Sequence, residues 1–305
     1  MTSVRSLRSR GVLLAGLGGA VLTGALVLAE AAPLRALPQA APAAATSFTT
    51  VRDGVRCSGP STTAARRMAR RVQDRVGPAL RAARVRMALA LDDTATGVRC
   101  TARSASHFDS ASVVKVAIVA ALLDARRRAG RTLSRTERAW ARAAITRSSN
   151  SAASALWRRV GGAAGMRRFF ARAGMTQTVP GARGVWGLTQ ITAFDQLLLL
   201  RRVTRPGLIA PADRTYLQGL MASVVRSQRW GVPTGAPSAA VVGNKNGWLP
   251  RAGRGWRVHS IGWVRLRTTT YEVVLLSDGN GSFAAGRARL DRVARAVHAA
   301  LGGRR

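Results

Sequence analysis

The sequence predicts an α+β fold of three layers (α/β/α), with a five-stranded antiparallel sheet formed by both chain ends and an inserted all-helical lobe. Two observations predict it. Segments in which apolar residues alternate, as they do in strands, lie on either side of a long central block with helical spacing. A helix precedes the first strands, and another follows the last. A sheet made from both ends of the chain, with the helices inserted between them, is the most economical arrangement of this order.

The individual elements follow from the spacing of the apolar residues. The strands are expected at residues 85–91, 98–103, 239–245, 257–266 and 270–277. The helices are expected at residues 61–83, 112–125, 134–147, 151–160, 163–172, 189–203, 211–226 and about 284–301. The helix over residues 112–125 is apolar on all sides except at Lys115 and Asp124, which is typical of a helix buried at the centre of a domain.

The N-terminal region differs in composition from the rest of the chain. A basic start leads into an apolar run and then into the small-residue site Ala29-Glu30-Ala31, so residues 1–31 are expected to be a secretory signal peptide. An uncleaved membrane anchor is the alternative. Residues 32–56, rich in Ala and Pro, are expected to be a flexible spacer, and residues 57–303 the folded domain, with its helical lobe at about 112–230. We therefore expect a secreted protein with no stable membrane span after the signal is cleaved.

The chain has two cysteines, Cys57 and Cys100, both in the part expected to be exported. An even number of cysteines in an oxidising compartment favours a disulfide between them. Two free thiols, one of them buried in a strand, are the alternative.

The formal net charge of +36 is carried by arginines spread through every segment. Nucleic-acid binding needs dense basic patches, so we expect no specific nucleic-acid partner. Electrostatic contact with anionic wall polymers is a secondary hypothesis. His107, His259 and His298 are scattered and have no acid at a useful spacing, so we interpret them as structural. Neither a metal nor another cofactor is expected.

Lysine occurs only at Lys115 and Lys245, although Lys and Arg together number 49. Arginine cannot lose its proton in a protein, whereas a buried lysine ammonium can, so the two retained lysines are candidates for acid–base chemistry. The motifs that contain or separate them are Ser112-x-x-Lys115, Ser148-x-Asn150 and Lys245-x-Gly247. Their order is a signature of serine acyl transfer.

The first of these motifs lies at the start of the buried helix. Ser112 and Lys115 are three residues apart and lie on one face, so the Lys115 amine can reach the Ser112 hydroxyl. The helix N-terminus directs partial positive charge at the same hydroxyl. Because burial lowers the pKa of a lysine, Lys115 is expected to act as a base toward Ser112.

The three motifs in this order of elements resemble the class A β-lactamases and related penicillin-recognising serine enzymes, over about residues 60–302. The resemblance implies a serine hydrolase that acts on β-lactams or on D-Ala-containing wall peptides. Ser112 would be the nucleophile, with Lys115 as its base or proton relay. Ser148 would pass the proton to the leaving nitrogen, and Lys245 would attract the substrate carboxylate and tune Ser148.

The resemblance also implies groups that bind the substrate. Asn150 would hold the substrate amide, and the backbone N–H groups of Ser112 and Trp248 would form the oxyanion hole. Gly247 would be small so that substrate can lie along the strand edge. The side chain of Trp248 would either line the pocket or pack beside it.

The chain departs from the family's pattern in three places. Ser149 and Asn246 stand where the family usually has Asp and Thr. No glutamate lies between the second and third motifs, where class A enzymes carry the one that activates water, and the acids of this interval, Asp195 and Asp213, are expected to be exposed helix residues. Acylation is therefore better supported than rapid deacylation. Slow turnover, use of Lys115 in both half-reactions, D,D-peptidase activity, and a catalytically impaired penicillin- or wall-binding module are the alternatives.

Overall fold

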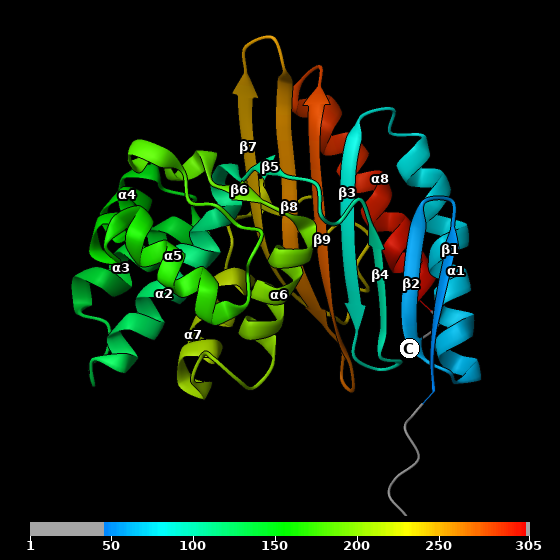
Figure 1. Cartoon of the computed structure of the whole chain (residues 1–305), viewed down its shortest axis with the longest axis horizontal. Helices are drawn as coiled ribbons and strands as arrows, with labels where there is room; N and C mark the ends of the chain where they lie inside the picture. The colour runs from blue at the N-terminus through cyan, green and yellow to red at the C-terminus, as the bar shows by residue number, and fades with distance from the viewer. Residues whose placement is uncertain (1–45, 303–305) are drawn as a thin grey trace, which may run out of the picture. The chain divides into compact units, whose positions relative to one another are not determined.

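The computed structural model describes residues 46–302, and its centre is a seven-stranded antiparallel sheet (Figure 1). The strand order across the sheet is β1-β2-β4-β3-β9-β8-β7. The strands are β1 (Ser47–Arg52), β2 (Val55–Pro60), β3 (Arg86–Asp93), β4 (Val98–Ala102), β7 (Val241–Arg251), β8 (Gly255–Arg265) and β9 (Thr270–Asn280). The first and last parts of the described chain meet where β3 pairs with β9, as the sequence predicts.

The expectation of five strands is wrong, because β1 and β2 add a hairpin at the edge beyond β4. Strand β1 and the start of β2 fall within residues 32–56, which were expected to be spacer. Strand β1 is buried at a single position and lacks a clear alternation, whereas β2 buries Val55 and Cys57. The two-residue turn Asp53-Gly54, in which both φ angles are positive, and the pairing of β2 with β4 together determine the hairpin. The expected signal peptide at 1–31 and residues 32–45 lie outside the described residues.

Helices cover both faces of the sheet (Figure 1). Helices α1 (Thr63–Arg81) and α8 (Phe283–Leu301) pack together on one face. The period of two in the strands decides which side chains they meet: Leu89 and Leu91 join this core, whereas Ala88 and Ala90 join the core under the helical lobe on the other face. The three-layer architecture agrees with the prediction.

The lobe consists of the helices between β4 and β7. They are α2 (Val114–Arg128), α3 (Arg135–Thr146), α4 (Asn150–Arg159), α5 (Gly162–Ala173), α6 (Ala193–Thr204) and α7 (Pro211–Ala222), with short 3-10 turns η1 (Ala111–Val113), η2 (Ala182–Gly184), η3 (Trp186–Leu188) and η4 (Arg226–Gln228). Eleven residues of α2 are buried, as its apolar sequence predicts. A two-stranded sheet of β5 (Phe108–Asp109) and β6 (Gln190–Ile191) joins the segment before α2 to the end of a loop over residues 176–188.

The expected disulfide is confirmed. Cys57 of β2 and Cys100 of β4 are paired across neighbouring strands and form a buried S–S bond. It ties the edge hairpin to the sheet. Within residues 46–302, no helix combines the length and the apolar character needed to cross a membrane.

Candidate active site

The turn before α2 presents Ser112. Ser112 is the one partly exposed residue in the otherwise buried run 108–124. The residue before it, Ala111, has a φ of 45°, a left-handed conformation that costs an alanine roughly 1–2 kcal/mol. Such strain persists where the surroundings force it, commonly at functional sites. The turn leaves the Ser112 hydroxyl at the N-terminal end of a long helix, where the helix dipole favours developing negative charge.

Lys115 lies in the first turn of α2 and is fully buried. Its Nζ donates hydrogen bonds to Ser148 O at 2.6 Å, Ser148 Oγ at 3.1 Å and Asn150 Oδ1 at 2.8 Å. Burial lowers the pKa of Lys115 to about 7. The amine thus bonds to the second motif rather than to Ser112, which differs from the contact expected from helix spacing alone.

Lys245 reaches the same hydroxyl from the sheet. Its Nζ donates to Ser148 Oγ at 3.0 Å and to Asn246 O at 2.8 Å, and its side chain is fully buried. Burial, and then the neighbouring charge of Lys115, hold the pKa of Lys245 well below its usual value. Among the described residues, no carboxylate forms an ion pair with either lysine. Both amines therefore favour their neutral form far more than an exposed lysine does.

Ser148 is the meeting point of the site. Its φ of 58° is left-handed, and this turns its hydroxyl toward both amines. A hydroxyl oxygen accepts two hydrogen bonds and still donates one. When both lysines donate, the Ser148 proton is available to a third group, whereas neutral Lys115 can itself accept that proton through its lone pair. Ser149, the residue that replaces the family's usual Asp, caps α4 by accepting from Ala152 N.

Gly247 lies against the nucleophile turn. A Cβ at this position would come within 2.8 Å of Ser112 N and 2.9 Å of Val113 N. The glycine is thus needed first for the close approach of β7 to the turn, whereas the sequence analysis assigned its small size to the passage of substrate. Lys245, two residues before Gly247, lies on the same face of β7, because side chains two apart on a strand share a face.

Asn246 and Trp248 alternate with Lys245 and Gly247 along β7, so their side chains point to the other face of the sheet. The Asn246 amide donates to Gln228 O at 2.9 Å and to Trp230 O at 3.0 Å, which anchors β7 to the segment that precedes it. The Trp248 ring packs against Phe283 of α8 and against Trp230, with centroids 5.4 and 6.0 Å apart. Of the two alternatives for the Trp248 side chain, packing agrees with the structure. Its backbone stays on the edge strand beside the nucleophile turn.

The loop over residues 176–188 brings Trp186 to the site. The Trp186 ring centroid is 4.9 Å from Lys115 Nζ, and its Nε1 donates to Ser154 Oγ at 3.0 Å. Trp186 belongs to none of the three motifs. The signal in the sequence that points to it is its place in the interval where class A enzymes carry a glutamate.

Asp195 was expected to be exposed, and this is wrong. Its side chain is fully buried and accepts from Gln177 N at 2.9 Å and Thr178 Oγ1 at 2.7 Å. Burial raises the pKa of Asp195, although these hydrogen bonds oppose the rise. Asp195 therefore holds the beginning of the loop onto α6. Asp213 pairs with Arg127 at 3.1 Å near the start of α7.

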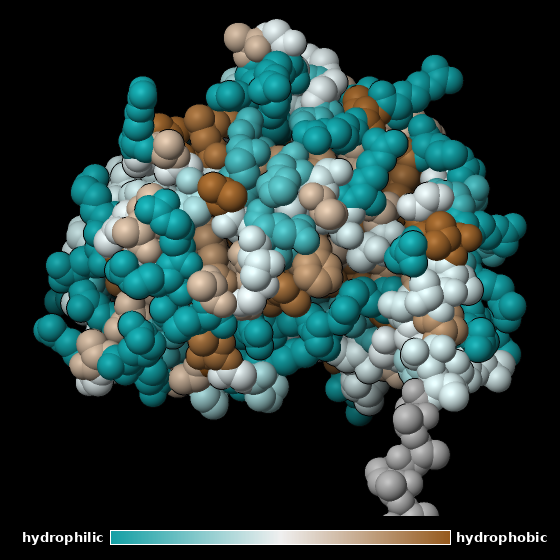
Figure 2. Space-filling view, in the orientation of Figure 1, coloured by the Kyte–Doolittle hydropathy of each residue, from teal (hydrophilic) through white to brown (hydrophobic). Residues whose placement is uncertain are grey.

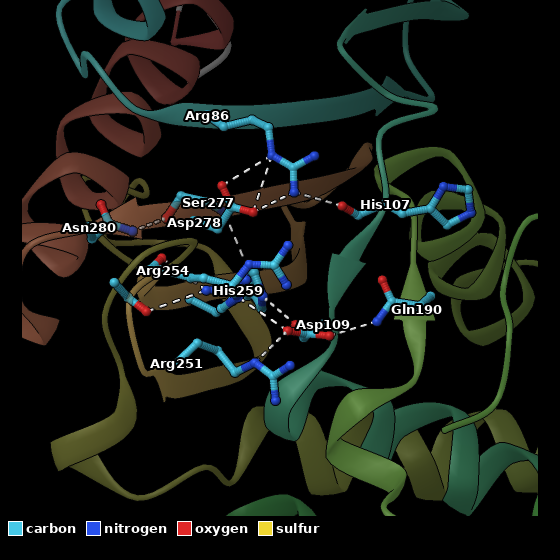
Figure 3. Close-up of polar contacts among 12 residues, drawn as sticks. Arg86, His107, Asp109, Gln190, Arg251, Arg254, His259, Ser277, Asp278 and Asn280 are labelled. Carbon is cyan, nitrogen blue, oxygen red and sulfur yellow. Dashed lines mark hydrogen bonds and ion pairs between the residues drawn. The ribbon is translucent and has the colours of Figure 1, made fainter. Parts of the chain in front are cut away.

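A polar cluster behind the nucleophile turn holds it in place (Figure 3). His259 of β8 bonds through Nε2 to Asp109 O at 2.8 Å and through Nδ1 to Ser277 N at 3.2 Å. The second bond requires Nδ1 to accept, so Nε2 carries the proton, and burial lowers the pKa of His259 to about 4. The structural role expected for His259 agrees with this geometry.

The Asp109 side chain extends the same support. Its carboxylate accepts from Gln190 Nε2 at 2.6 Å and pairs with Arg257 at 3.2 Å and Arg251 at 3.4 Å (Figure 3). It thus joins the nucleophile turn to the end of the loop and to the β7–β8 hairpin. Asp109 lies outside the three motifs, but an acid three residues before the serine is a usable signal in a chain with so few acids. Across residues 46–302, no group of three or more His, Cys, Asp or Glu side chains could hold a metal ion.

Comparisons with known proteins agree with this arrangement. A family model described as "Beta-lactamase enzyme family" matches residues 134–301. No curated protein matches the chain. Among solved structures, the chain is similar to a beta lactamase from Xanthomonas campestris pv. campestris str. ATCC 33913, with 21% identity, 76% of this chain and 97% of that chain covered, and a TM-score of 0.66.

Two further solved structures have the same fold. A beta lactamase from Burkholderia vietnamiensis is 18% identical, with 77% of this chain and 97% of that chain covered and a TM-score of 0.67. The protein PBP-A is 20% identical, with 76% and 96% covered and a TM-score of 0.67. At these identities the likeness applies to the fold.

Proposed function

Because the chain belongs to the beta-lactamase enzyme family and is a β-lactamase-like serine hydrolase, we propose that it is acylated at Ser112 by β-lactams or by D-Ala-containing wall peptides. The observation that carries the proposal is the pair of buried, acid-free lysines that share Ser148 Oγ. Burying an ammonium without a counter-charge is costly, and proteins tolerate that cost mainly where the group works.

In the first half-reaction, neutral Lys115 takes the Ser112 proton, through the hydroxyl of Ser148, and Ser112 Oγ attacks the carbonyl carbon. A pKa of about 7 leaves a substantial share of Lys115 neutral near pH 7. The negative charge that develops on the carbonyl oxygen is stabilised by the backbone N–H groups of Ser112 and Trp248. The close approach of β7 to the turn at Gly247 supports this pairing of donors.

When the C–N bond breaks, the leaving nitrogen takes the Ser148 proton, and Ser148 is reprotonated by the ammonium of Lys115. Lys245 donates a hydrogen bond to Ser148 Oγ, and a substrate carboxylate that binds beside it raises the pKa of its amine, so that the ammonium form attracts the substrate. Asn150 binds the substrate amide while its Oδ1 keeps Lys115 in place. These steps regenerate a neutral Lys115 beside the acyl-enzyme.

We propose that the acyl-enzyme is hydrolysed slowly. One oxygen of Asp195, Oδ2, accepts hydrogen bonds from Gln177 N and Thr178 Oγ1, and its buried Oδ1 has no hydrogen-bond partner within residues 46–302. Asp213 is paired with Arg127. The residue that the loop places over the Lys115 amine is Trp186, which cannot act as a base. Of the two buried amines of the site, Lys115 is the one that the first half-reaction regenerates in its neutral form, so it is our candidate for the group that activates water.

Mass spectrometry of the intact protein with benzylpenicillin tests both half-reactions. We expect a covalent adduct that forms quickly on the wild type, persists over a long chase and is absent from Ser112→Ala. Equal labelling of Ser112→Ala would refute the assignment of the nucleophile. Rapid loss of the adduct would refute slow deacylation.

The second candidate is a catalytically impaired penicillin- or wall-binding module of the same fold, favoured by Trp186 in place of a loop glutamate. Steady hydrolysis of a chromogenic cephalosporin, abolished by Lys115→Arg, would eliminate it. Release of D-Ala from a wall peptide without β-lactam turnover would instead favour D,D-peptidase activity. We also propose that residues 1–31 direct secretion, which N-terminal sequencing of the exported protein would test.

A further inference from the structure

A second cavity, separate from the candidate active site, lies where the β1–β2 turn, the end of α1 and the start of β3 come together (Figure 1). Its volume is about 810 Å³. Four arginines line it: Arg81, Arg84, Arg86 and Arg103. The rest of the lining is mainly aliphatic, so the cavity combines an apolar wall with a high density of guanidinium groups.

The charges in this cavity are not balanced. Asp53 is the acid among the lining residues, and it pairs with Arg81 at 2.5 Å. Arg86 pairs with Asp278. For Arg84 and Arg103, which are both exposed, no side-chain ion pair or hydrogen bond occurs within residues 46–302. Two guanidinium groups are therefore free to bind an external anion.

The backbone around the cavity is strained. Six described non-glycine residues have positive φ; three belong to the nucleophile turn, Ser148 and the loop, and the other three line this cavity. These three are Asp53 at 52°, Arg84 at 49° and Arg103 at 47°. Glycine is the ordinary residue at such positions, and the Cβ of an arginine there crowds the following carbonyl oxygen. Arginine at positions 84 and 103 is thus unfavourable for the backbone, which indicates that its side chain has a use in the cavity.

The cavity continues into a neighbour of about 340 Å³. The two share Gly54, Ala102 and Arg103, and the second adds Arg56. Together they form a groove much larger than a single phosphate ion, with Arg84, Arg103 and Arg56 along it. Several guanidinium groups along one groove suit a ligand that carries several anionic groups in a row.

We propose that this groove binds a linear phosphate polymer that lacks nucleobases. The guanidinium fork matches phosphate oxygens and keeps its charge at any physiological pH, which explains why arginine lines the groove. Single-stranded nucleic acids are usually held by aromatic side chains that stack on the bases. No aromatic residue lines either part of the groove. In Figure 2 hydrophilic residues are spread over the visible face with apolar residues among them, so a hydrophilic surface does not by itself mark a site; the distinguishing feature of the groove is that it is concave.

The double variant Arg84→Gly/Arg103→Gly tests the groove, because glycine removes the charge and also relieves the left-handed strain. Binding of a short linear polyphosphate to the full chain is measured by calorimetry at physiological salt. We expect an affinity loss of about tenfold or more, with an unchanged or higher melting temperature. The matched control, Arg131→Gln/Arg135→Gln, removes two exposed arginines of the lobe and should weaken binding by about twofold or less.

Several outcomes would overturn the proposal. Equal losses in both double variants would mean attraction to net charge rather than to a site. Binding of inorganic phosphate as tight as that of the polymer would mean a single-ion site. Equal or tighter binding of poly-L-glutamate or of a single-stranded oligonucleotide would rule out a phosphate polymer without bases. None of these measurements uses acylation at Ser112, so the result is independent of the proposed catalytic function.

Discussion

Two clusters of buried charge in the helical lobe behave in opposite ways. Glu137, on α3, is fully buried and accepts hydrogen bonds from Arg126 and Arg159, the latter at 2.8 Å, and from Ser134 N at 2.9 Å. Burial alone would raise the pKa of Glu137, but these donors lower it to about 2. At the site, burial lowers the pKa of Lys115 to about 7, and no carboxylate opposes it.

The difference shows how structural and catalytic charges are distinguished. The Glu137 cluster satisfies a buried charge completely, and its Ser134 capping box also begins α3. The lysine cluster leaves two buried amines with neutral partners and thereby keeps them able to exchange protons. A paired buried charge is compatible with a stable fold, whereas an unpaired buried amine lowers stability but can exchange a proton during catalysis.

The largest expected effect comes from Lys115→Arg. Arginine keeps its proton, so the acylation rate should fall by about a thousandfold, within the range typical for loss of a general base. Rapid-mixing kinetics with a fluorescent penicillin measures the rate. Lys115→Met should be equally inactive but at least as stable as the wild type at pH 6, because it removes a buried, unpaired ammonium. A Lys115→Met protein that is clearly less stable than the wild type would contradict the conclusion that the buried Lys115 amine destabilises the fold.

Glu137→Gln should have the opposite effect, lowering stability and leaving acylation unchanged. Removing one partner of a buried ion pair is expected to lower the free energy of unfolding by about 3 kcal/mol, with the acylation rate per folded molecule unchanged. Urea denaturation followed by circular dichroism measures the loss. The control, Asp213→Asn, breaks a more exposed pair and should cost about 0–1 kcal/mol. A large fall in acylation by folded Glu137→Gln would contradict a purely structural role.

Gly247→Ala changes the geometry of the nucleophile turn and leaves every charged residue of both clusters in place. The added Cβ would lie 2.8 Å from Ser112 N, so we expect acylation to slow by about tenfold to a hundredfold through displacement of the turn. The same kinetic assay measures it. Gly219→Ala in α7, where nothing lies within 4 Å of the new Cβ, is the control and should leave the rate unchanged.

The pH dependence of stability should differ in sign between the two clusters. The folded-state pKa of Lys115 lies below its unfolded value, so the unfolded chain binds more protons above pH 7, and stability should rise with pH from about 7 to 10. The folded-state pKa of Glu137 is about 2, so its contribution should be lost as pH falls from about 4.5 toward 2. Denaturant titrations over pH should show both slopes, and Lys115→Met should reduce the alkaline one, leaving the part that Lys245 contributes. The acylation rate should rise through pH 7.

Much of the fold was predictable because it depends on local periodicity. The buried helix α2, the hairpin of β3 and β4 and the closing helix α8 all follow from apolar spacing, and the pairing of Cys57 with Cys100 follows from an even count. The hairpin of β1 and β2 was missed because its stability comes from pairing with β4. Asp195 was misassigned because nothing local distinguishes a helix residue that faces solvent from one that faces a loop.

The sequence by itself determined which residues do chemistry: the scarcity of lysine and the order of three short motifs singled out Ser112, Lys115, Ser148 and Lys245, because residue type sets which groups can exchange protons. Only the tertiary structure decided how they meet. It brought both lysines to one hydroxyl, placed Trp186 over the amine and removed carboxylates from their surroundings. Residues far apart in the chain make these contacts, and burial, which no local pattern specifies, sets their pKa values.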